Sequence, residues 1–230
     1  YFHIMWLDGV MILPIVMLGI ERVLQKKSSI VYILSLVYAI MSNYYIGYMI
    51  CIASVLYFIF ELFHQYKWKT DKKEIFKIFI RYAISSLLSG LICMIILIPT
   101  LIELQSGYKA DSFGIGSGLG FHFNFLDVWS RSYIGSHNYS NVLSKKTINI
   151  YCGLLVLPLL YFFFINKNIK TRKKIIYGIF FIVLSLGVYF DMFNMIWHAF
   201  NSANCFNYRY SFIIMFIMIA VAAHSFLEIE

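Results

Sequence analysis

The chain has 230 residues, of which 61% are hydrophobic and only 13% are charged, and its mean hydropathy is +0.76. Soluble domains are about half apolar and about a quarter charged, so this composition leaves too little polar surface for a water-soluble globule. It also excludes a disordered chain, a collagen-like fibre and a secreted disulfide scaffold. The net charge of +8 raises the question of which loops carry it, because basic loops orient membrane proteins and face anionic lipid. We therefore expect a membrane protein that binds membrane lipid and no nucleic acid.

Charge clusters divide the chain into apolar intervals. A membrane-spanning helix needs about 20 mostly apolar residues, and several intervals approach this length. We predict an all-α fold, a polytopic transmembrane helical bundle that forms one domain over residues 1–230. The seven predicted spans are Met5–Val23, Ile30–Ser42, Tyr44–Phe63, Ile78–Pro99, Ile148–Ile165, Ile175–Phe190 and Tyr210–Leu227.

The uncharged stretch Ser28–Phe60 is the hardest to divide. As one helix it would be about 50 Å long, which is too long for a single crossing without heavy tilt. Basic residues precede this stretch and others follow it, so a hairpin that returns both of its ends to the cytoplasm obeys the positive-inside rule. The polar residues Ser42, Asn43, Tyr44 and Tyr45 are the predicted turn.

This division places most basic residues on one side of the membrane. Fourteen Lys and Arg residues lie on the predicted inner side, in the clusters 22–27, 67–81 and 167–174. Five lie on the other side, which predicts an outside N-terminus and an inside C-terminus in a bacterial plasma membrane. Because Tyr1 is followed at once by a span with no cleavage site, we expect an internal fragment whose earlier spans precede Tyr1.

The predicted outer side carries two longer loops, about residues 100–147 and 191–208. The first has Glu103 at its start and contains Gly114, Gly116, Gly118 and Gly120, a spacing that does not match a nucleotide-binding motif because Leu119 occupies the required glycine position. A flexible linker and a lid over a groove are both compatible with it. The histidines and cysteines are too dispersed for a ligand cluster, so no metal site is predicted.

Asp8 lies inside the first apolar run, close to its predicted outer end. An ionisable residue at membrane depth costs about 2.5–3.5 kcal/mol on insertion scales and is therefore usually paired or functional. The alternative is an interfacial aspartate at headgroup level.

The second loop concentrates polar and aromatic residues at the mouth of two spans, beginning with Asp191. Arg209 is its single basic residue, and a guanidinium suits bidentate phosphate binding. His198 and Asn204 suit hydroxyl groups, and Tyr208 offers an aromatic face. This combination predicts a site for a sugar and a phosphate, while an aromatic belt with a snorkelling arginine is the structural alternative.

Four stretches resemble the YfhO family of bacterial membrane proteins. They are WLDGVMILPIVMLGIERVL at Trp6–Leu24, SNYYIGYMICIASVLYFIFEL at Ser42–Leu62, INIYCGLLVLPLLYFFF at Ile148–Phe164 and WHAFNSANCFNYRYSF at Trp197–Phe212. The second and fourth are the most specific, since Asn-Tyr-Tyr-x-Gly-Tyr and Tyr-Arg-Tyr-Ser-Phe do not follow from hydrophobic composition alone.

The resemblance implies a GT-C-like glycosyltransferase linked to lipoteichoic acid. Such an enzyme takes a sugar from a polyprenyl-phosphate carrier and transfers it to an envelope polymer at the outer membrane face. The lipid-linked sugar would be its donor, with no covalently bound cofactor, and a requirement for a divalent metal stays open. GT-C enzymes generally use an acidic residue of the first external loop as catalytic base, which for this chain is expected upstream of Tyr1.

Residue roles follow from this reading. We expect Asp8 and His198 to orient or deprotonate the acceptor and Arg209 to bind the carrier phosphate. Tyr208, Asn204, Asn43, Tyr44 and Tyr45 are the further substrate-binding candidates, and Asp191 and Glu103 are second-rank candidates.

Two other functions stay open. A flippase or transporter of a lipid-linked sugar would be expected to show internal repeats or broken helices, which the sequence does not clearly have. A non-catalytic scaffold of envelope synthesis is the other.

Overall fold

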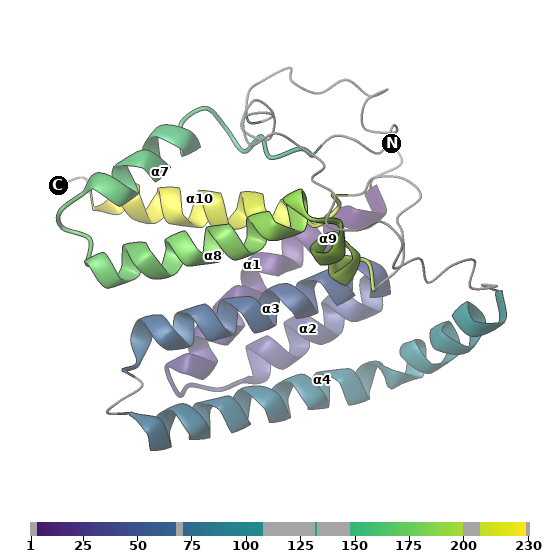
Figure 1. The fold of residues 1–230 in the computed structure, drawn as a ribbon. Coiled ribbons are helices and arrows are strands. Elements are labelled where there is room, and N and C mark those ends of the chain that lie inside the picture. The colour runs from purple at the N-terminus through teal and green to yellow at the C-terminus, as the bar shows by residue number, and fades with distance from the viewer. Residues whose placement is uncertain (1–3, 68–70, 108–131, 133–147, 200–207, 229–230) are drawn as a thin grey trace. The chain divides into compact units, whose positions relative to one another are not determined.

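The computed structural model describes residues 4–67, 71–107, 132, 148–199 and 208–228. The elements in these ranges are all α-helices, which confirms the all-α prediction (Figure 1). They are α1 (Ile4–Leu24), α2 (Ile30–Ser42), α3 (Tyr44–Gln65), α4 (Lys72–Gly107), α7 (Val156–Ile165), α8 (Thr171–Tyr189), α9 (Asp191–Trp197) and α10 (Ser211–Leu227).

The backbone contacts divide the chain into two compact units, Tyr1–Phe113 and Gly114–Glu230. The first contains α1 to α4 and the second contains α7 to α10. That the two form a single transmembrane domain stays a prediction.

Two helices are long and apolar enough to cross a membrane within the described residues. They are α3, over Tyr44–Gln65, and the part of α4 over Lys72–Glu103. By contrast, α2, α7 and α10 are shorter apolar helices. With 13 residues α2 is about 20 Å long, against a hydrocarbon core of roughly 30 Å. The predicted count of seven spans therefore stays a prediction.

The predicted hairpin between α2 and α3 is confirmed. Ser42 ends α2, Tyr44 begins α3, and Asn43 caps both helices. The Asn43 side-chain oxygen accepts hydrogen bonds from the backbone N–H groups of Tyr45 and Ile46, each at 3.1 Å. This satisfies two of the donors that the first turn of a helix leaves without an intrahelical partner, which makes the turn abrupt.

Two predicted boundaries are wrong. The span predicted from Ile148 becomes helical only at Val156, because Gly153 takes a left-handed φ of +112° and Asn149 accepts a hydrogen bond from the Tyr151 N–H, which forms a turn. The predicted outer loop from Thr100 begins inside α4, which continues through Pro99 to Gly107. Proline removes one helical hydrogen bond without ending the helix here.

The second predicted loop also contains a helix, α9. Asn194 and Trp197 of α9 and His198, which directly follows the helix, are buried, and their spacing is that of one helix face. The density of Asn and aromatic residues in this segment concealed that spacing.

The first unit is held together by close helix packing. A Cβ atom at Gly19 of α1 would lie 2.5 Å from the Cα atom of Tyr32 in α2, and one at Gly47 of α3 would lie 2.7 Å from the Cα atom of Ile40 in α2. Small residues permit such backbone approach, which is the usual way in which membrane helices associate.

A hydroxyl network crosses the interior of this unit. The Tyr32 hydroxyl lies 2.9 Å from that of Ser86 and 3.5 Å from that of Ser54, and Ser54 lies 3.0 Å from the Tyr82 hydroxyl. The Tyr82 ring stacks on Phe58 with centroids 3.9 Å apart. Polar groups buried among apolar helices require such partners, so the network fixes how α2, α3 and α4 fit together.

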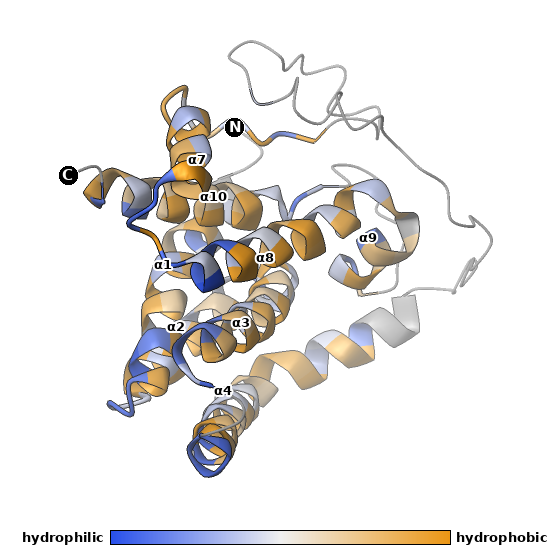
Figure 2. Ribbon diagram, turned by 60° about the vertical axis from the view of Figure 1, so that its left-hand side comes forward, coloured by the Kyte–Doolittle hydropathy of each residue, from blue (hydrophilic) through white to orange (hydrophobic). Residues whose placement is uncertain are grey.

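The basic ends of the helices meet within each unit. In the first unit, Lys26 after α1 forms a 2.7 Å ion pair with Glu74 in the first turn of α4, and the hydrogen bond and charge of Glu74 raise the pKa of Lys26. In the second unit, Lys173 Nζ of α8 lies 2.7 Å from His224 Nε2 of α10. Figure 2 shows the starts of α4 and α8 in blue and their middle portions largely in orange.

Candidate functional site

The residues that connect α9 to α10 form an aromatic and basic cluster in the second unit. We call Trp197, His198, Tyr208, Arg209 and Tyr210 the α9–α10 cluster. Trp197 stacks on Tyr210 with ring centroids 4.9 Å apart and an interplanar angle of 11°. His198 and Tyr208 each approach the same tyrosine edge-on, with centroids 6.2 Å away. Tyr210 is thus the centre on which the other rings are arranged.

Burial distinguishes the members of this cluster. The side chains of Trp197, His198, Tyr208 and Tyr210 are buried, whereas Arg209 is half-buried. A partly exposed guanidinium beside buried aromatic rings can bind an anion that arrives from outside. The buried rings pack against one another around Tyr210.

Gly187 of α8 makes room for the stacked pair. A Cβ atom at this position would lie 2.8 Å from Trp197 Nε1 and 3.3 Å from the Tyr210 hydroxyl oxygen. The two polar tips therefore point at the glycine and not at solvent. Among the described residues, the Tyr210 hydroxyl and Asn194 Oδ1 are buried atoms without a hydrogen-bond partner.

The cluster lies at the end of α8 opposite to its basic residues. Lys173, in the first turn of α8, reaches His224 near the end of α10, while Gly187, in the last turn of α8, meets Tyr210 at the start of α10. The two helices are therefore antiparallel. One end of the pair carries lysines and the other carries the α9–α10 cluster, which is the separation that the positive-inside rule predicts for a membrane protein.

The candidate residues of the first unit share one end of that unit. Asp8 is exposed in the second turn of α1, and a Cβ atom at its neighbour Gly9 would collide with Ile46 in the first turn of α3. The start of α1 thus lies beside the turn that contains Asn43, Tyr44 and Tyr45. Asn43 has a structural role as the cap of α3, Tyr44 is exposed and Tyr45 is half-buried.

The remaining candidates are less well placed by the structure. Glu103 is exposed on α4, four residues after Pro99. Asp191 is the first residue of α9, and only its backbone is described. Asn204 and the glycine run 114–120 lie outside the described residues. Within the second unit, His198 and Tyr208 both approach Tyr210, and Arg209 lies between the two tyrosines in the chain. Within the first unit, Asp8 lies near the turn before α3.

Sequence reasoning missed a polar cluster at the basic end of the first unit. The Glu21 carboxylate accepts hydrogen bonds from the Tyr57 hydroxyl at 2.8 Å and from Gln65 Nε2 at 2.9 Å. Glu61, which is buried, lies 3.4 Å from the same Gln65 nitrogen and 3.1 Å from His64 Nδ1. The spacing of Tyr57, Glu61 and Gln65 at every fourth residue was the available signal, because it places all three on one face of α3.

No group of three or more His, Cys, Asp or Glu side chains within the described part of the chain could hold a metal ion. The α9–α10 cluster supplies a guanidinium cation, an imidazole and aromatic rings. These groups suit an anionic and partly apolar ligand.

No curated protein and no solved structure was found to match the chain. A family model does match, over residues 1–230, and is described as bacterial membrane protein YfhO. The match covers the whole chain, including the stretches at Ser42–Leu62 and Trp197–Phe212 that carry the resemblance in the sequence. The chain belongs to the YfhO family of bacterial membrane proteins.

Proposed function

We propose that the chain is part of a membrane glycosyltransferase. The enzyme transfers a sugar from a polyprenyl-phosphate carrier to a cell-envelope polymer, such as lipoteichoic acid, at the outer face of the plasma membrane. The observation that carries this proposal is the α9–α10 cluster, in which the half-buried Arg209 directly precedes Tyr210, whose ring stacks on Trp197 at the end of α8 opposite to its lysines.

Each part of the cluster suits one part of a lipid-linked sugar. Arg209 would hold the carrier phosphate, because a guanidinium forms two parallel hydrogen bonds with phosphate oxygens. Tyr208 would pack against the sugar or the first part of the lipid. Asn204, in the segment between α9 and α10, would contact sugar hydroxyl groups.

His198 and Asp8 would handle the acceptor. An imidazole titrates near neutral pH and can take the proton of an attacking hydroxyl, and a carboxylate can do the same or orient the acceptor. In this proposal Asp8 and the turn at Asn43, Tyr44 and Tyr45 lie on the outer side of the membrane, as the α9–α10 cluster does. Asp191 and Glu103 are held as second-rank candidates for the same task.

The test is a gene deletion in the native bacterium, followed by the sugar content of purified lipoteichoic acid and wall polymer. The full-length wild-type gene should restore a lost sugar, and an Arg209→Ala gene should not, because the mutant cannot hold the carrier phosphate. Arg172→Ala is the matched control, since it removes the same charge at the basic end of α8.

Membrane levels of each variant are measured by immunoblot. Full restoration of the sugar by Arg209→Ala would refute the phosphate-binding role. An unchanged polymer in the deletion strain, with a lipid-linked sugar accumulating at the inner leaflet, would refute glycosyl transfer and indicate a flippase.

A further inference from the structure

A cavity of about 710 Å³ lies between α7, α8 and α10 of the second unit. Its walls are almost entirely apolar, and its wall residues include Phe164 of α7, Gly178, Ile182 and Ser185 of α8, and Ile214 and Met218 of α10. The Ser185 hydroxyl donates a hydrogen bond to the Phe181 carbonyl of its own helix at 2.7 Å. Ordered water needs two or more polar partners, so these walls favour an apolar occupant over water.

The cavity is elongated along α8. Gly178, Ile182, Ser185 and Tyr189 line it, and their spacing places them on one face of the helix. From Gly178 to Tyr189 this face is about 17 Å long. The volume lies within the roughly 300–1,000 Å³ usual for ligand sites. An apolar space that follows α8 over this length can hold a hydrocarbon chain.

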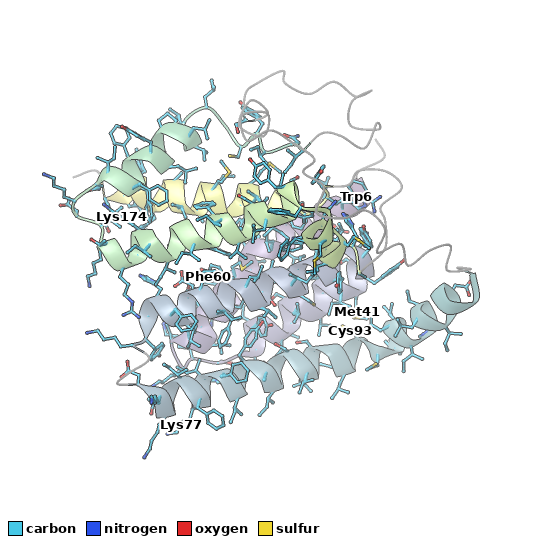
Figure 3. All side chains as sticks on the ribbon, in the orientation of Figure 1. Trp6, Met41, Phe60, Lys77, Cys93 and Lys174 are labelled. Atoms are coloured by element: carbon cyan, nitrogen blue, oxygen red, sulfur yellow. The ribbon has the colours of Figure 1, made fainter. Side chains whose placement is uncertain are left out.

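One end of this face is basic. Lys174 lies one turn before Gly178, on the same face of α8, and its side chain is half-buried. It is labelled at the start of α8 in Figure 3. The neighbouring basic residues Lys167, Lys170, Arg172 and Lys173 belong to the same end of the unit. Clusters of this size attract anionic lipid headgroups.

We propose that this cavity binds one acyl chain of an anionic phospholipid, with Lys174 holding the headgroup phosphate. The apolar walls supply affinity for the chain, and the lysines select the headgroup. The proposed headgroup site lies at the opposite end of α8 from Arg209, while the cavity for the acyl chain extends along α8 to Tyr189. The bound chain fills the space that α7, α8 and α10 leave between them.

The full-length protein is reconstituted into phosphatidylcholine vesicles that contain a small fraction of a photoreactive lipid with a diazirine on its acyl chain. Two photoreactive lipids with identical chains are compared, phosphatidylglycerol and phosphatidylcholine. After irradiation, labelled peptides are identified by mass spectrometry. We expect phosphatidylglycerol to label the cavity face of α8 about fivefold more than phosphatidylcholine, since each basic residue near the membrane surface contributes on that order.

Two variants test the binding of the acyl chain and the binding of the headgroup separately. Gly178→Leu should abolish the labelling, because the added side chain enters the cavity beside Phe164, whose ring lies 3.8 Å from the position of a Cβ atom. Gly90→Leu is its control, since a Cβ atom at that helical glycine meets nothing within 4 Å. In Lys174→Gln the two lipids should label the cavity equally, and the packing should not change. Lys73→Gln should leave the labelling by both lipids unchanged.

Equal labelling of the wild type by the two lipids would overturn the proposal, as would full labelling of Gly178→Leu. A third result would also overturn it. If polyprenyl phosphate displaces the label at a concentration at which unlabelled phosphatidylglycerol does not, the cavity belongs to the carrier lipid.

Discussion

At the scale of single residues, Tyr210 organises the α9–α10 cluster through its ring and not through its hydroxyl. The ring is fully buried, stacks on Trp197 and meets His198 and Tyr208 edge-on. Its hydroxyl has no hydrogen-bond partner among the described residues. A buried polar group without a partner lowers the free energy of unfolding by about 1–3 kcal/mol. A role of this hydroxyl in ligand binding would explain why the protein keeps it.

Two substitutions of Tyr210 test the contributions of its ring and its hydroxyl to stability separately. Tyr210→Phe should unfold at the same or a higher temperature than the wild type, because it removes only the unpaired hydroxyl. Tyr210→Ala should lose about 3–5 kcal/mol, the usual cost of removing a buried aromatic ring. Thermal unfolding in detergent, followed by circular dichroism, measures both. A marked loss of stability in Tyr210→Phe would show that the hydroxyl is paired in the protein.

Asn43 lies in the turn that the sequence predicts within a long apolar stretch. The structure adds that this residue caps α3, which the sequence analysis did not predict. Its hydrogen bonds to Tyr45 and Ile46 account for the asparagine without any ligand. Its contribution to substrate binding stays a prediction.

At the scale of elements, the first unit depends on glycines at the helix contacts. Because Gly19 has no side chain, the backbones of α1 and α2 can approach each other closely. Gly47 permits the same close approach between α3 and α2. The neighbouring groups are backbone atoms, which cannot move aside as a flexible side chain can. These two contacts, with the hydroxyl network around Tyr32, define how the four helices pack.

Gly47→Leu should therefore destabilise the protein by at least the 1–3 kcal/mol that overpacking usually costs. Gly90→Leu introduces the same side chain into open space on α4 and should change stability by less than about 0.5 kcal/mol. The two midpoints of thermal unfolding, measured in the same detergent, are compared. Equal midpoints for the two variants would mean that α2 and α3 do not pack at Gly47 in the membrane.

At the scale of the whole molecule, apolar periodicity and the distribution of basic residues predicted most of the helices. The ends of α2 and the start of α3 were predicted to the residue because a polar asparagine interrupts an apolar run. The start of α7 was not, because the turn at Gly153 depends on a backbone conformation that hydropathy does not report. His198, Tyr208 and Arg209 could be grouped from sequence because they are close along the chain. The pairing of Glu21 with Gln65 could not, because it requires α1 and α3 to be adjacent.

We propose above all that the α9–α10 cluster lies at the outer membrane face, where a lipid-linked sugar would be presented. Cysteine labelling tests this location in a full-length protein whose native cysteines are replaced. Ala199→Cys, at an exposed position next to His198, and Lys167→Cys, at an exposed position of the basic end of the second unit, are each treated in intact cells with a membrane-impermeant maleimide. We predict that Ala199→Cys is labelled in intact cells and that Lys167→Cys is labelled only after the cells are permeabilised. Labelling of Lys167→Cys but not Ala199→Cys in intact cells, or labelling of Ala199→Cys only after permeabilisation, would contradict the outer location of the cluster.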